Sequence, residues 1–435
     1  MLSIRRPGER TAELLQRLVN VRPGEVAALV WAFLYFFSLL CSYYIVRPMR
    51  DEMGIAGGVD NLQWLFTGTF LAMLAVVPLF GWVSSRFERR RFLPAVYGFF
   101  IVNLLLFFVL FQSAVTHAWV ARAFFIWTSV FNLFVVSVFW SFMTDIFSNA
   151  QARRLFGCIA AGGTAGAICG PLLTTLLALP LGPANLLPVS AGLLGIAVFC
   201  IHRLGAWQAA AGQGNPAATQ NAAAIGGQVL AGVQLALRSP YLLGICLLML
   251  LFTTLATFLY FQQAQIVRDS FPDPAQRTAV FAAMDLAVNI LTLLFQVLLT
   301  GRLVQWLGLG WTLALLPLLL AAGFLALGLS PVLAVLVLVQ VLRRAGNYAI
   351  TRPAREMLYV VLGREEKYKA KNFIDTVVYR GGDALSAWAY AGLSALGLGL
   401  SAIALLAVPL ALLWAGIAYR LGQAQTRRSG QAESL

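Results

Sequence analysis

Charged side chains are scarce in this chain. Asp, Glu, Lys and Arg make up 11% of its 435 residues, whereas 60% are hydrophobic. Soluble domains carry about 25% charged residues, so this composition excludes a surface built to face water. A membrane-spanning helix needs about 20 apolar residues, so about twelve spans would use about 240 residues. The remainder is too short for an extramembrane catalytic domain of ordinary size.

The residues that usually carry catalysis or bind metals are also few. The two histidines, His117 and His202, lie near the ends of apolar segments, and no GxxxxGK[ST] phosphate loop occurs. The five cysteines fall inside apolar segments without metal-ligand spacing: Cys41, Cys158, Cys169, Cys200 and Cys246. We therefore expect no metal site, no cofactor and no enzymatic activity.

Lysine is rare as well, with only three lysines among the 31 basic residues, which is typical of a GC-rich bacterial genome. The net charge of +14 does not indicate nucleic-acid binding, because most Lys and Arg residues gather in alternate loops. The opposite loops hold four arginines: Arg47, Arg50, Arg268 and Arg277. The positive-inside rule then predicts cytoplasmic termini, and we expect a bacterial inner-membrane protein.

Apolar runs are what the chain has in abundance, and they predict an all-α membrane protein of about twelve transmembrane helices in two pseudo-symmetric six-helix halves. The expected spans are 25–46, 62–83, 92–113, 119–146, 155–178, 184–202, 240–266, 279–300, 310–329, 331–351, 373–396 and 398–419. The expected divisions are a cytoplasmic segment 1–24, a first half 25–202, a cytoplasmic linker 203–239, a second half 240–420 and a cytoplasmic tail 421–435.

The two halves echo each other at a near-constant offset. The echoes are Arg50-Asp51 with Arg268-Asp269 at 218 residues, Gly81 with Gly301 at 220, and Ala152-Arg153 with Ala370-Lys371 at 218. Each pair follows or precedes the corresponding span. Two parallel six-helix halves joined by a cytoplasmic linker resemble the plan of the major facilitator superfamily.

Ionisable residues at membrane depth are the main functional candidates, because they are costly there unless they face a cavity or a partner. Asp145 ends the fourth predicted span and Asp285 lies in the eighth, while the eleventh carries Asp375, Arg380 and Asp383. Arg380 has two interpretations. It either pairs with an aspartate of its own helix or acts as an anion clamp in a central cavity.

Other charges suggest gates. A salt bridge that forms only when the outer mouth closes would use Arg50-Asp51 and Arg268-Asp269, although both pairs also fit solvated loop charges. Arg343 and Arg344 are either a cytoplasmic gate or side chains that extend to the interface. The glycines of the fifth span (Gly157, Gly162, Gly163, Gly166 and Gly170) predict close helix packing.

Three sequence blocks resemble the bacterial and plastid-type ATP/ADP translocases. They are Tyr44–Asp51, then Phe139–Phe142 continuing through Ala152–Gly157, and Arg352–Tyr359 with Lys369–Asp375 and Arg380–Gly382. The resemblance implies exchange of ATP for ADP and phosphate through a central anion site, with Arg50 and Lys371 at basic positions of the family. The chain departs from the pattern where the family has acidic residues, at Gln151 and at one of Gln262, Gln263 and Gln265.

The leading hypothesis is a secondary transporter that exchanges nucleotides, or a related organic phosphate, by alternating access. Its predicted substrate-binding residues are Arg47, Arg50, Lys371, Arg380 and Asp375. Its predicted coupling and gating residues are Asp51, Asp145, Asp285, Arg268, Asp269 and Asp383. The alternatives are a proton-coupled transporter of another small solute, with one of the intramembrane aspartates as proton carrier, and a non-transporting scaffold or sensor. The expected partners are an anionic small molecule and membrane lipid, without nucleic acid, for a monomeric protein.

Overall fold

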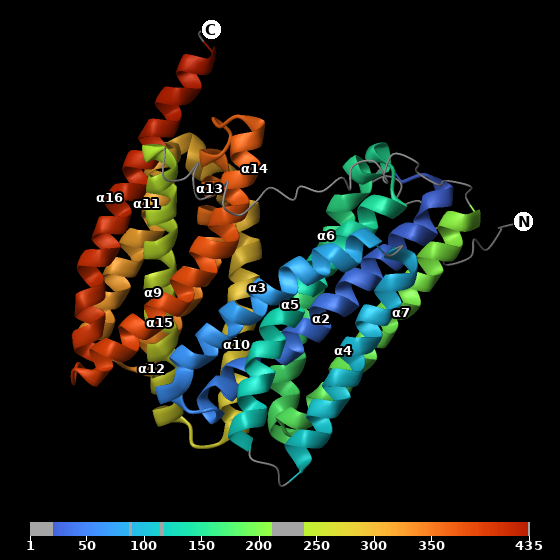
Figure 1. The fold of residues 1–435 in the computed structure, drawn as a ribbon, viewed down its shortest axis with the longest axis horizontal. Coiled ribbons are helices and arrows are strands. Elements are labelled where there is room, and N and C mark those ends of the chain that lie inside the picture. Colours follow the sequence, from blue (N-terminus) through green and yellow to red (C-terminus); the bar gives the residue numbers. More distant parts are fainter. Residues whose placement is uncertain (1–20, 87–88, 114–116, 211–238, 434–435) are drawn as a thin grey trace, which may run out of the picture. The chain divides into compact units, whose positions relative to one another are not determined.

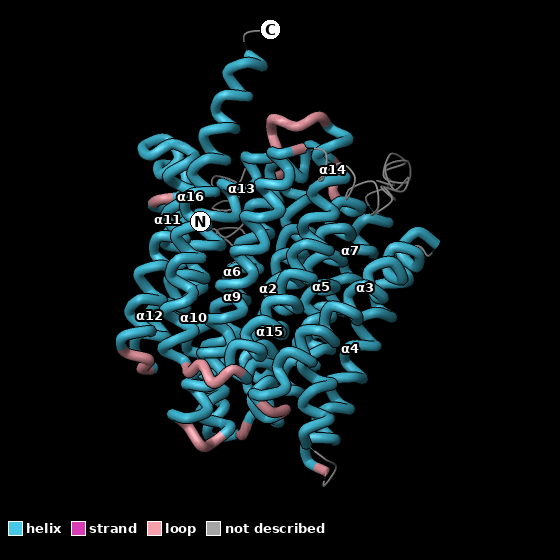
Figure 2. Tube along the Cα trace, turned by 60° about the vertical axis from the view of Figure 1, so that its left-hand side comes forward, coloured by secondary structure: helices cyan, strands magenta, loops and turns pink. Residues whose placement is uncertain are grey.

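The computed structural model describes residues 21–86, 89–113, 117–210 and 239–433. Within these ranges every regular element is a helix (Figure 2). Eleven helical segments of this part are long and apolar enough to cross a membrane. The prediction of an all-α membrane protein of about twelve spans is therefore confirmed. Most of the predicted segment 1–24 and of the predicted linker 203–239 lies outside the described residues.

The first six spans are single long helices (Figure 1). They are α2 (Val26–Ala56), α3 (Leu62–Arg86), α4 (Arg89–Gln112), α5 (His117–Ile146), α6 (Asn149–Leu181) and α7 (Leu186–Ala210). Three short 3-10 turns connect or precede them: η1 (Pro23–Glu25), η2 (Val59–Asn61) and η3 (Pro183–Asn185). At the start of α6 the Ser148 hydroxyl accepts from the Gln151 backbone, and the Gln151 side chain accepts from the Ser148 backbone. This reciprocal cap satisfies two backbone donors that the helix cannot pair itself.

The last six spans include two that are broken. The other four spans are α9 (Pro240–Ser270), α10 (Pro274–Leu298), α11 (Thr300–Leu329), which is kinked at Gly308, and α16 (Leu400–Glu433). The tenth span consists of α12 (Leu333–Gly346), the π-helical turn η4 (Asn347–Thr351) and α13 (Arg352–Leu358). The eleventh consists of α14 (Arg364–Phe373), the π-helical turn η5 (Ile374–Val378) and α15 (Tyr379–Ala395). The eleventh is not among the eleven apolar segments, because Asp375, Arg380 and Asp383 make it less apolar.

The helices form two compact units that do not coincide with the two halves of the sequence. Residues 51–71, which comprise the end of α2, η2 and the start of α3, belong to the second unit with most of the later helices. Residues 278–283 of α10 belong to the first unit. The second unit is therefore built from both halves of the chain.

In the first unit, glycines let α6 lie directly on α2. A Cβ atom at Gly162 would come within 2.6 Å of the Phe33 carbonyl oxygen, and one at Gly170 within 2.7 Å of the Cys41 carbonyl oxygen. Between them, a Cβ at Gly166 would overlap the Phe37 carbonyl oxygen. One glycine of each turn of α6 thus faces a carbonyl of α2, a spacing that permits close backbone approach. The predicted close packing is confirmed for these glycines, whereas at Gly157 a Cβ would meet nothing within 4 Å.

The second unit repeats this arrangement. A Cβ at Gly382 of α15 would lie 2.5 Å from the Thr253 hydroxyl of α9, so the eleventh span packs on the seventh as the fifth packs on the first. Likewise α4 contacts α7 in the first unit, and α11 contacts α16 in the second. Because third and sixth spans pair in one unit and ninth and twelfth in the other, the two sets of helices share one packing plan.

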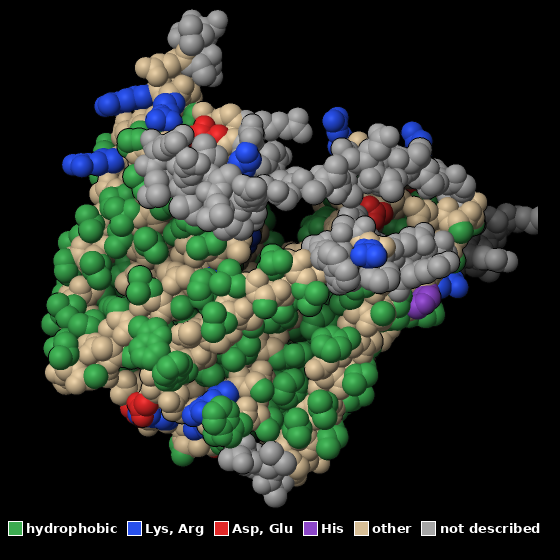
Figure 3. Space-filling model, viewed as in Figure 1, with side chains coloured by type: hydrophobic (Ala, Val, Ile, Leu, Met, Phe, Trp, Pro, Cys, Tyr) green, Lys and Arg blue, Asp and Glu red, His purple; other side chains and the backbone are tan. Residues whose placement is uncertain are grey.

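Large apolar side chains remain exposed along the lengths of the helices. Val102 of α4 is 65% exposed and Val297 of α10 is 73% exposed. On the face shown in Figure 3, hydrophobic side chains cover the helix surfaces and Lys and Arg side chains gather at helix ends. Lipid tails satisfy such a surface, and the backbone polar groups are paired inside the helices.

Candidate functional site

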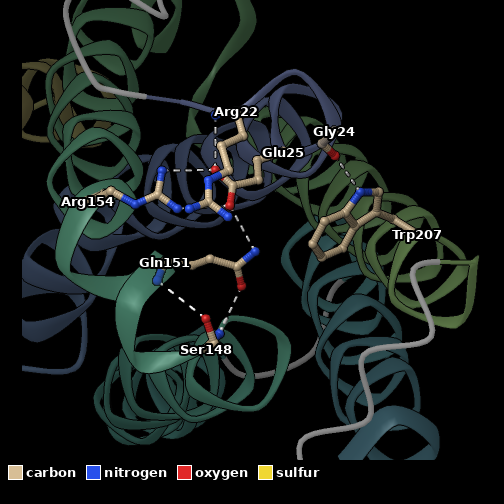
Figure 4. Close-up of polar contacts among 7 residues, drawn as sticks. All are labelled: Arg22, Gly24, Glu25, Ser148, Gln151, Arg154 and Trp207. Carbon is tan, nitrogen blue, oxygen red and sulfur yellow. Dashed lines mark hydrogen bonds and ion pairs between the residues drawn. The ribbon is translucent and has the colours of Figure 1, made fainter.

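A buried carboxylate in the first unit ties the start of α2 to the start of α6 (Figure 4). Glu25 accepts two hydrogen bonds from Arg154, at 2.9 and 3.1 Å, and a third from the Gln151 side-chain amide at 3.1 Å. The Arg22 backbone N–H donates to the same carboxylate, and the indole of Trp207 donates to the Gly24 carbonyl oxygen at 2.9 Å. Burial raises the pKa of Glu25, but the donors from Arg154, Arg22 and Gln151 outweigh it and hold the pKa below its ordinary value.

Because its pKa is lower in the folded protein, Glu25 stabilises the fold above its unfolded pKa, and this contribution is lost as the pH falls through the folded pKa. We expect Glu25→Gln to lower the free energy of unfolding at neutral pH by about 1.5–3 kcal/mol, because it loses charge-assisted hydrogen bonds. The difference from wild type should shrink below about pH 4. Thermal unfolding across pH tests this, with Asp60→Asn at an exposed carboxylate as the control. A difference that persists unchanged at acid pH would contradict it.

The predicted basic residues of the first unit lie on aromatic rings. Arg47 lies over the ring of Tyr44 at 5.7 Å, and Arg50 lies over the ring of Phe125 at 4.2 Å. Such cation–π contacts hold a guanidinium in place without neutralising it. The backbone carbonyl of Asp145 accepts from the Gln208 side chain at 3.1 Å.

A polar cluster in the second unit joins the end of α2 to α9 and α10. Arg277 donates through Nε to Glu52 Oε2 at 2.6 Å and through Nη2 to Glu52 Oε1 at 2.7 Å. Its Nη1 donates to the carbonyl oxygens of Phe271 and Pro272 at 3.0 and 3.1 Å. The Glu52 side chain is fully buried and that of Arg277 is 11% exposed. We call this bidentate ion pair between Glu52 and Arg277 the α2–α10 clasp. Two parallel hydrogen bonds between a guanidinium and a carboxylate are the geometry in which a buried charge pair is most favourable.

Neighbouring contacts extend the clasp. The Tyr260 hydroxyl of α9 donates to Asp51 Oδ1 at 3.0 Å. The Trp388 indole of α15 donates to the Thr67 hydroxyl of α3 at 3.0 Å, and the rings of Trp64 and Trp388 meet edge to face at 4.8 Å. The segment 51–71 is therefore held by α9, α10 and α15 through both polar and aromatic contacts.

The other predicted gate pair is far less enclosed. Arg268 Nε contacts Asp269 Oδ1 at 3.0 Å, with the two side chains 39% and 56% exposed. An exposed pair between neighbours on one helix contributes little to stability.

A second buried ion pair links α10 to α12. Arg344 Nη2 lies 2.5 Å from Asp285 Oδ1, and the side chains are 8% and 2% exposed. Arg344 therefore points inward to a carboxylate rather than towards a membrane interface.

Three further ion pairs in the second unit are looser or more exposed. Lys371 Nζ donates to Glu356 Oε2 at 2.6 Å, with side chains 34% and 41% exposed. Arg355 Nη2 lies 3.5 Å from Asp375 Oδ1, and Arg380 Nη1 lies 3.7 Å from Asp383 Oδ2. The Arg380 side chain is 31% exposed. Of the two aspartates considered for Arg380, the structure pairs it with Asp383, whereas Asp375 meets Arg355.

A chain of amides leads from α9 to a guanidinium on α12. The Gln340 side chain donates to Gln263 Oε1, and its own oxygen accepts from Arg343 Nε at 2.8 Å. On α15, Arg380 lies over the ring of Tyr379 at 5.3 Å. Tyr379 also interacts electrostatically with Arg343.

Two π-helical turns interrupt the spans that carry these charges. Asp375 lies within η5, and η4 separates Arg343 and Arg344 from Arg355. A π turn leaves helix carbonyls without their ordinary partners, and here the Thr300 hydroxyl of α11 donates to the Ala349 carbonyl of η4 at 2.7 Å. Isolated π turns inside α-helices are frequent at functional sites.

Several members of these clusters were not singled out from the sequence. Glu52 directly follows the predicted Arg50-Asp51 pair, and Arg277 was noted only as one loop arginine. Gln340 and the pairing roles of Arg355 and Glu356 were also missed. Apart from the contact of Gln340 with Arg343, three residues away on α12, their partners lie on other helices, so local sequence spacing does not reveal them. Among the described residues, no group of three or more His, Cys, Asp and Glu side chains is arranged to hold a metal ion.

The sequence and the architecture both resemble those of known transporters. The model of the Major Facilitator Superfamily matches residues 27–360. The nucleoside transporter NupG shares 14% identity and a TM-score of 0.63, over 94% of this chain and 99% of its own. The transporter PepTSo of the POT family shares 13% identity and a TM-score of 0.63, over 92% and 98%. A bacterial homolog of the human lysosomal transporter Spinster, solved inward-facing and unoccupied, shares 13% identity and a TM-score of 0.55, over 94% and 99%.

No curated protein sequence matches the chain. At identities this low, the likeness to solved structures shows the fold alone. The family match, however, covers well over half of the chain and includes spans from both halves. The chain therefore belongs to the Major Facilitator Superfamily and is a secondary transporter of that type.

Proposed function

We propose that this transporter exchanges nucleotides of the ATP/ADP type, or a related organic phosphate, through a basic site. The substrate-binding residues we assign are Arg47, Arg50, Lys371, Arg380 and Asp375. The resemblance of three sequence blocks to the ATP/ADP translocases supports this proposal. We place the protein in a bacterial inner membrane as a monomer with both termini in the cytoplasm.

The observation that carries the proposal is the contrast between two classes of ion pair in the second unit. The Glu52–Arg277 and Asp285–Arg344 pairs are short and buried, so losing either partner would strand a charge. The Arg380–Asp383 pair is long and partly exposed, at 3.7 Å. Lys371 is similarly accessible, with 34% of its side chain exposed. An accessible cation can exchange an internal carboxylate for a substrate phosphate at little cost, since partly exposed pairs are weak.

Transport into liposomes tests the exchange. We expect purified protein in proteoliposomes to take up radiolabelled ATP or ADP only when unlabelled nucleotide is present inside. Arg380→Ala and Lys371→Ala should each raise the KM for nucleotide by about tenfold or more, because each removes a charge-assisted hydrogen bond to phosphate. Arg420→Ala, which removes an exposed cation of α16 outside both the assigned site and the assigned gate, is the matched control. No uptake by protein with a normal unfolding transition would overturn nucleotide exchange.

Coupling and gating in this scheme are assigned to Asp51, Asp145, Asp285, Arg268, Asp269 and Asp383. The clasp adds Glu52 and Arg277 to this group, because it joins the end of the first span to the start of the eighth. Opening the predicted extracellular mouth would require this pair to separate. Its bidentate geometry makes the closed arrangement specific, as a gate requires.

A proton-coupled transporter of another small solute is the second candidate. The buried Asp285–Arg344 pair favours it, because a proton that reaches Asp285 would cancel the charge that holds Arg344. NupG, a nucleoside transporter, and PepTSo, a POT family transporter, show that this fold serves solutes other than nucleotides. Solute uptake that follows an imposed proton gradient and loses that dependence in Asp285→Asn would favour this function over nucleotide exchange.

A further inference from the structure

Five side chains gather where the end of the tenth span meets the start of the eleventh, at α13, α14 and η5 (Figure 1). Lys371 Nζ donates to Glu356 Oε2 at 2.6 Å and lies 6.0 Å from the centre of the Tyr359 ring. Arg355 Nη2 lies 3.5 Å from Asp375 Oδ1. Arg355 and Tyr359 are four residues apart on helical backbone, so their side chains lie on one face of α13. We call these five residues the Arg355 cluster.

The Arg355 guanidinium is enclosed, yet few of its donors meet an oxygen. Its side chain is 13% exposed. Nη1 donates to the sulfur of Met249 on α9 at 2.8 Å, and a thioether is a weak acceptor. The 3.5 Å between Nη2 and Asp375 is longer than an ordinary hydrogen bond. Nε is buried and has no hydrogen-bond partner among the described residues. Arg355 therefore keeps most of its donor capacity.

The Tyr359 hydroxyl is a second donor in the same position. Tyr359 is fully buried, and its hydroxyl has no hydrogen-bond partner within the part of the chain that the structure describes. Buried hydroxyls are normally paired, as Tyr241 of α9 is with the Leu358 carbonyl oxygen at 2.8 Å. A guanidinium can only donate and a phenol donates readily, so the group that complements both Arg355 and Tyr359 is an acceptor.

The rest of the cluster indicates which acceptor fits. Lys371, Glu356 and Asp375 are all partly exposed, so the cluster is open to a solute on that side. Asp375 supplies one carboxylate and reaches Arg355 only at 3.5 Å. A phosphate group carries several anionic oxygens and can accept from a guanidinium, an ammonium and a hydroxyl at once. Two cations and a phenol around one partly exposed position therefore favour phosphate over a single carboxylate.

We propose that Arg355 and Tyr359 bind a phosphate group of the transported substrate. Lys371 is the second cation of this site, and Asp375 is the carboxylate that phosphate displaces from Arg355. The inference deepens the proposed function and rests on it in treating the substrate as an organic phosphate. It adds two binding residues to the assigned site and names the part of the substrate that they recognise.

Titration calorimetry with pyrophosphate on the purified full-length protein tests the inference. We expect Tyr359→Phe to weaken binding by about tenfold, because it removes one hydrogen bond to a charged group. Arg355→Gln should weaken binding by more than that, since it removes a charge as well. Tyr390→Phe is the matched control and should bind as wild type, because this buried tyrosine lies near the end of α15 that is remote from η5.

Thermal unfolding of the same variants separates binding from support of the fold. Without pyrophosphate, Tyr359→Phe should unfold at the wild-type temperature or above, because the hydroxyl that it removes forms no hydrogen bond within the described protein. Weaker binding together with a lower unfolding temperature would make the hydroxyl a structural group and overturn the inference. If Arg355→Gln does not fold, Arg355→Lys keeps the charge, loses Nε and should still weaken binding.

The remaining outcomes separate this site from the proposed function. Pyrophosphate binding that is unchanged in Tyr359→Phe and in the Arg355 variant would overturn the inference, as would a wild type that binds no pyrophosphate. ATP exchange with an unchanged KM in Tyr359→Phe would overturn the inference and leave nucleotide exchange standing. Pyrophosphate binding that depends on Arg355 and Tyr359, in a protein that does not exchange ATP, would uphold the inference and overturn nucleotide exchange.

Discussion

Glu52→Gln is expected to lower the free energy of unfolding by about 3–5 kcal/mol, because it leaves the buried Arg277 without its negative partner. The pair is bidentate, at 2.6 and 2.7 Å, and the Glu52 side chain is fully buried. Arg277→Gln should cost a similar amount, since it removes the cation and also its bonds to the carbonyls of Phe271 and Pro272. Thermal or denaturant unfolding of the detergent-purified protein measures both.

The double variant distinguishes a pair from two independent residues. Glu52→Gln with Arg277→Gln should cost clearly less than the sum of the single changes, because neither charge is then stranded. Arg268→Ala, in an exposed pair at the end of α9, should change stability by less than about 0.5 kcal/mol. Additive losses, or a Glu52→Gln variant as stable as wild type, would show that the clasp does not hold segment 51–71 in place.

The second large effect is expected at Asp285. Asp285→Ala should destabilise the protein by about 3–5 kcal/mol, because Arg344 is 8% exposed and would keep its charge inside the second unit. Replacing both residues, as Asp285→Leu with Arg344→Met, should recover most of that loss, since well-packed apolar side chains substitute for a buried ion pair at little cost. Unfolding measurements on the two single variants and the double variant test this.

Transport by the same double variant adds a functional readout. If the pair only supports the fold, a stable double variant should transport as wild type. Loss of uptake in a stable double variant would assign the charges to the transport cycle. A double variant no more stable than Asp285→Ala would contradict the argument that a stranded charge causes the loss.

The helices were predictable because the bilayer imposes one simple requirement on sequence. A run of about 20 apolar residues is both necessary and recognisable, so α9 and α5 appear in the sequence almost as plainly as in the structure. The eleventh span was harder, since Asp375, Arg380 and Asp383 interrupt its apolar run. The π turns η4 and η5 carry no sequence signal that separates them from ordinary helix. Their residues extend helices on both sides without glycine or proline inside.

The partners of the charged residues were not predictable in the same way. Sequence spacing detects contacts within one helix, and it correctly offered Asp383 as a partner for Arg380. It is silent on Glu52 with Arg277, because contacts between helices depend on rotation about each helix axis. In a membrane, the face of a helix that contacts lipid and the face that contacts the protein interior are both apolar. The distribution of hydrophobic residues around a helix is therefore a weak guide to that rotation. The structure was needed to divide the charges into buried pairs and accessible cations.

Residues 51–71 come from the first half of the sequence but belong to the second unit, and this has a consequence for the order of synthesis. Glu52 and Arg277 lie 225 residues apart, so Glu52 leaves the ribosome long before its partner exists. At about 5–20 residues per second, the delay is about 10–45 s. The end of the first span is made before the six helices α3, α4, α5, α6, α7 and α9, and its Glu52 can pair with Arg277 only after they have been synthesised. The second unit therefore cannot be completed until residues from both halves of the chain have been synthesised.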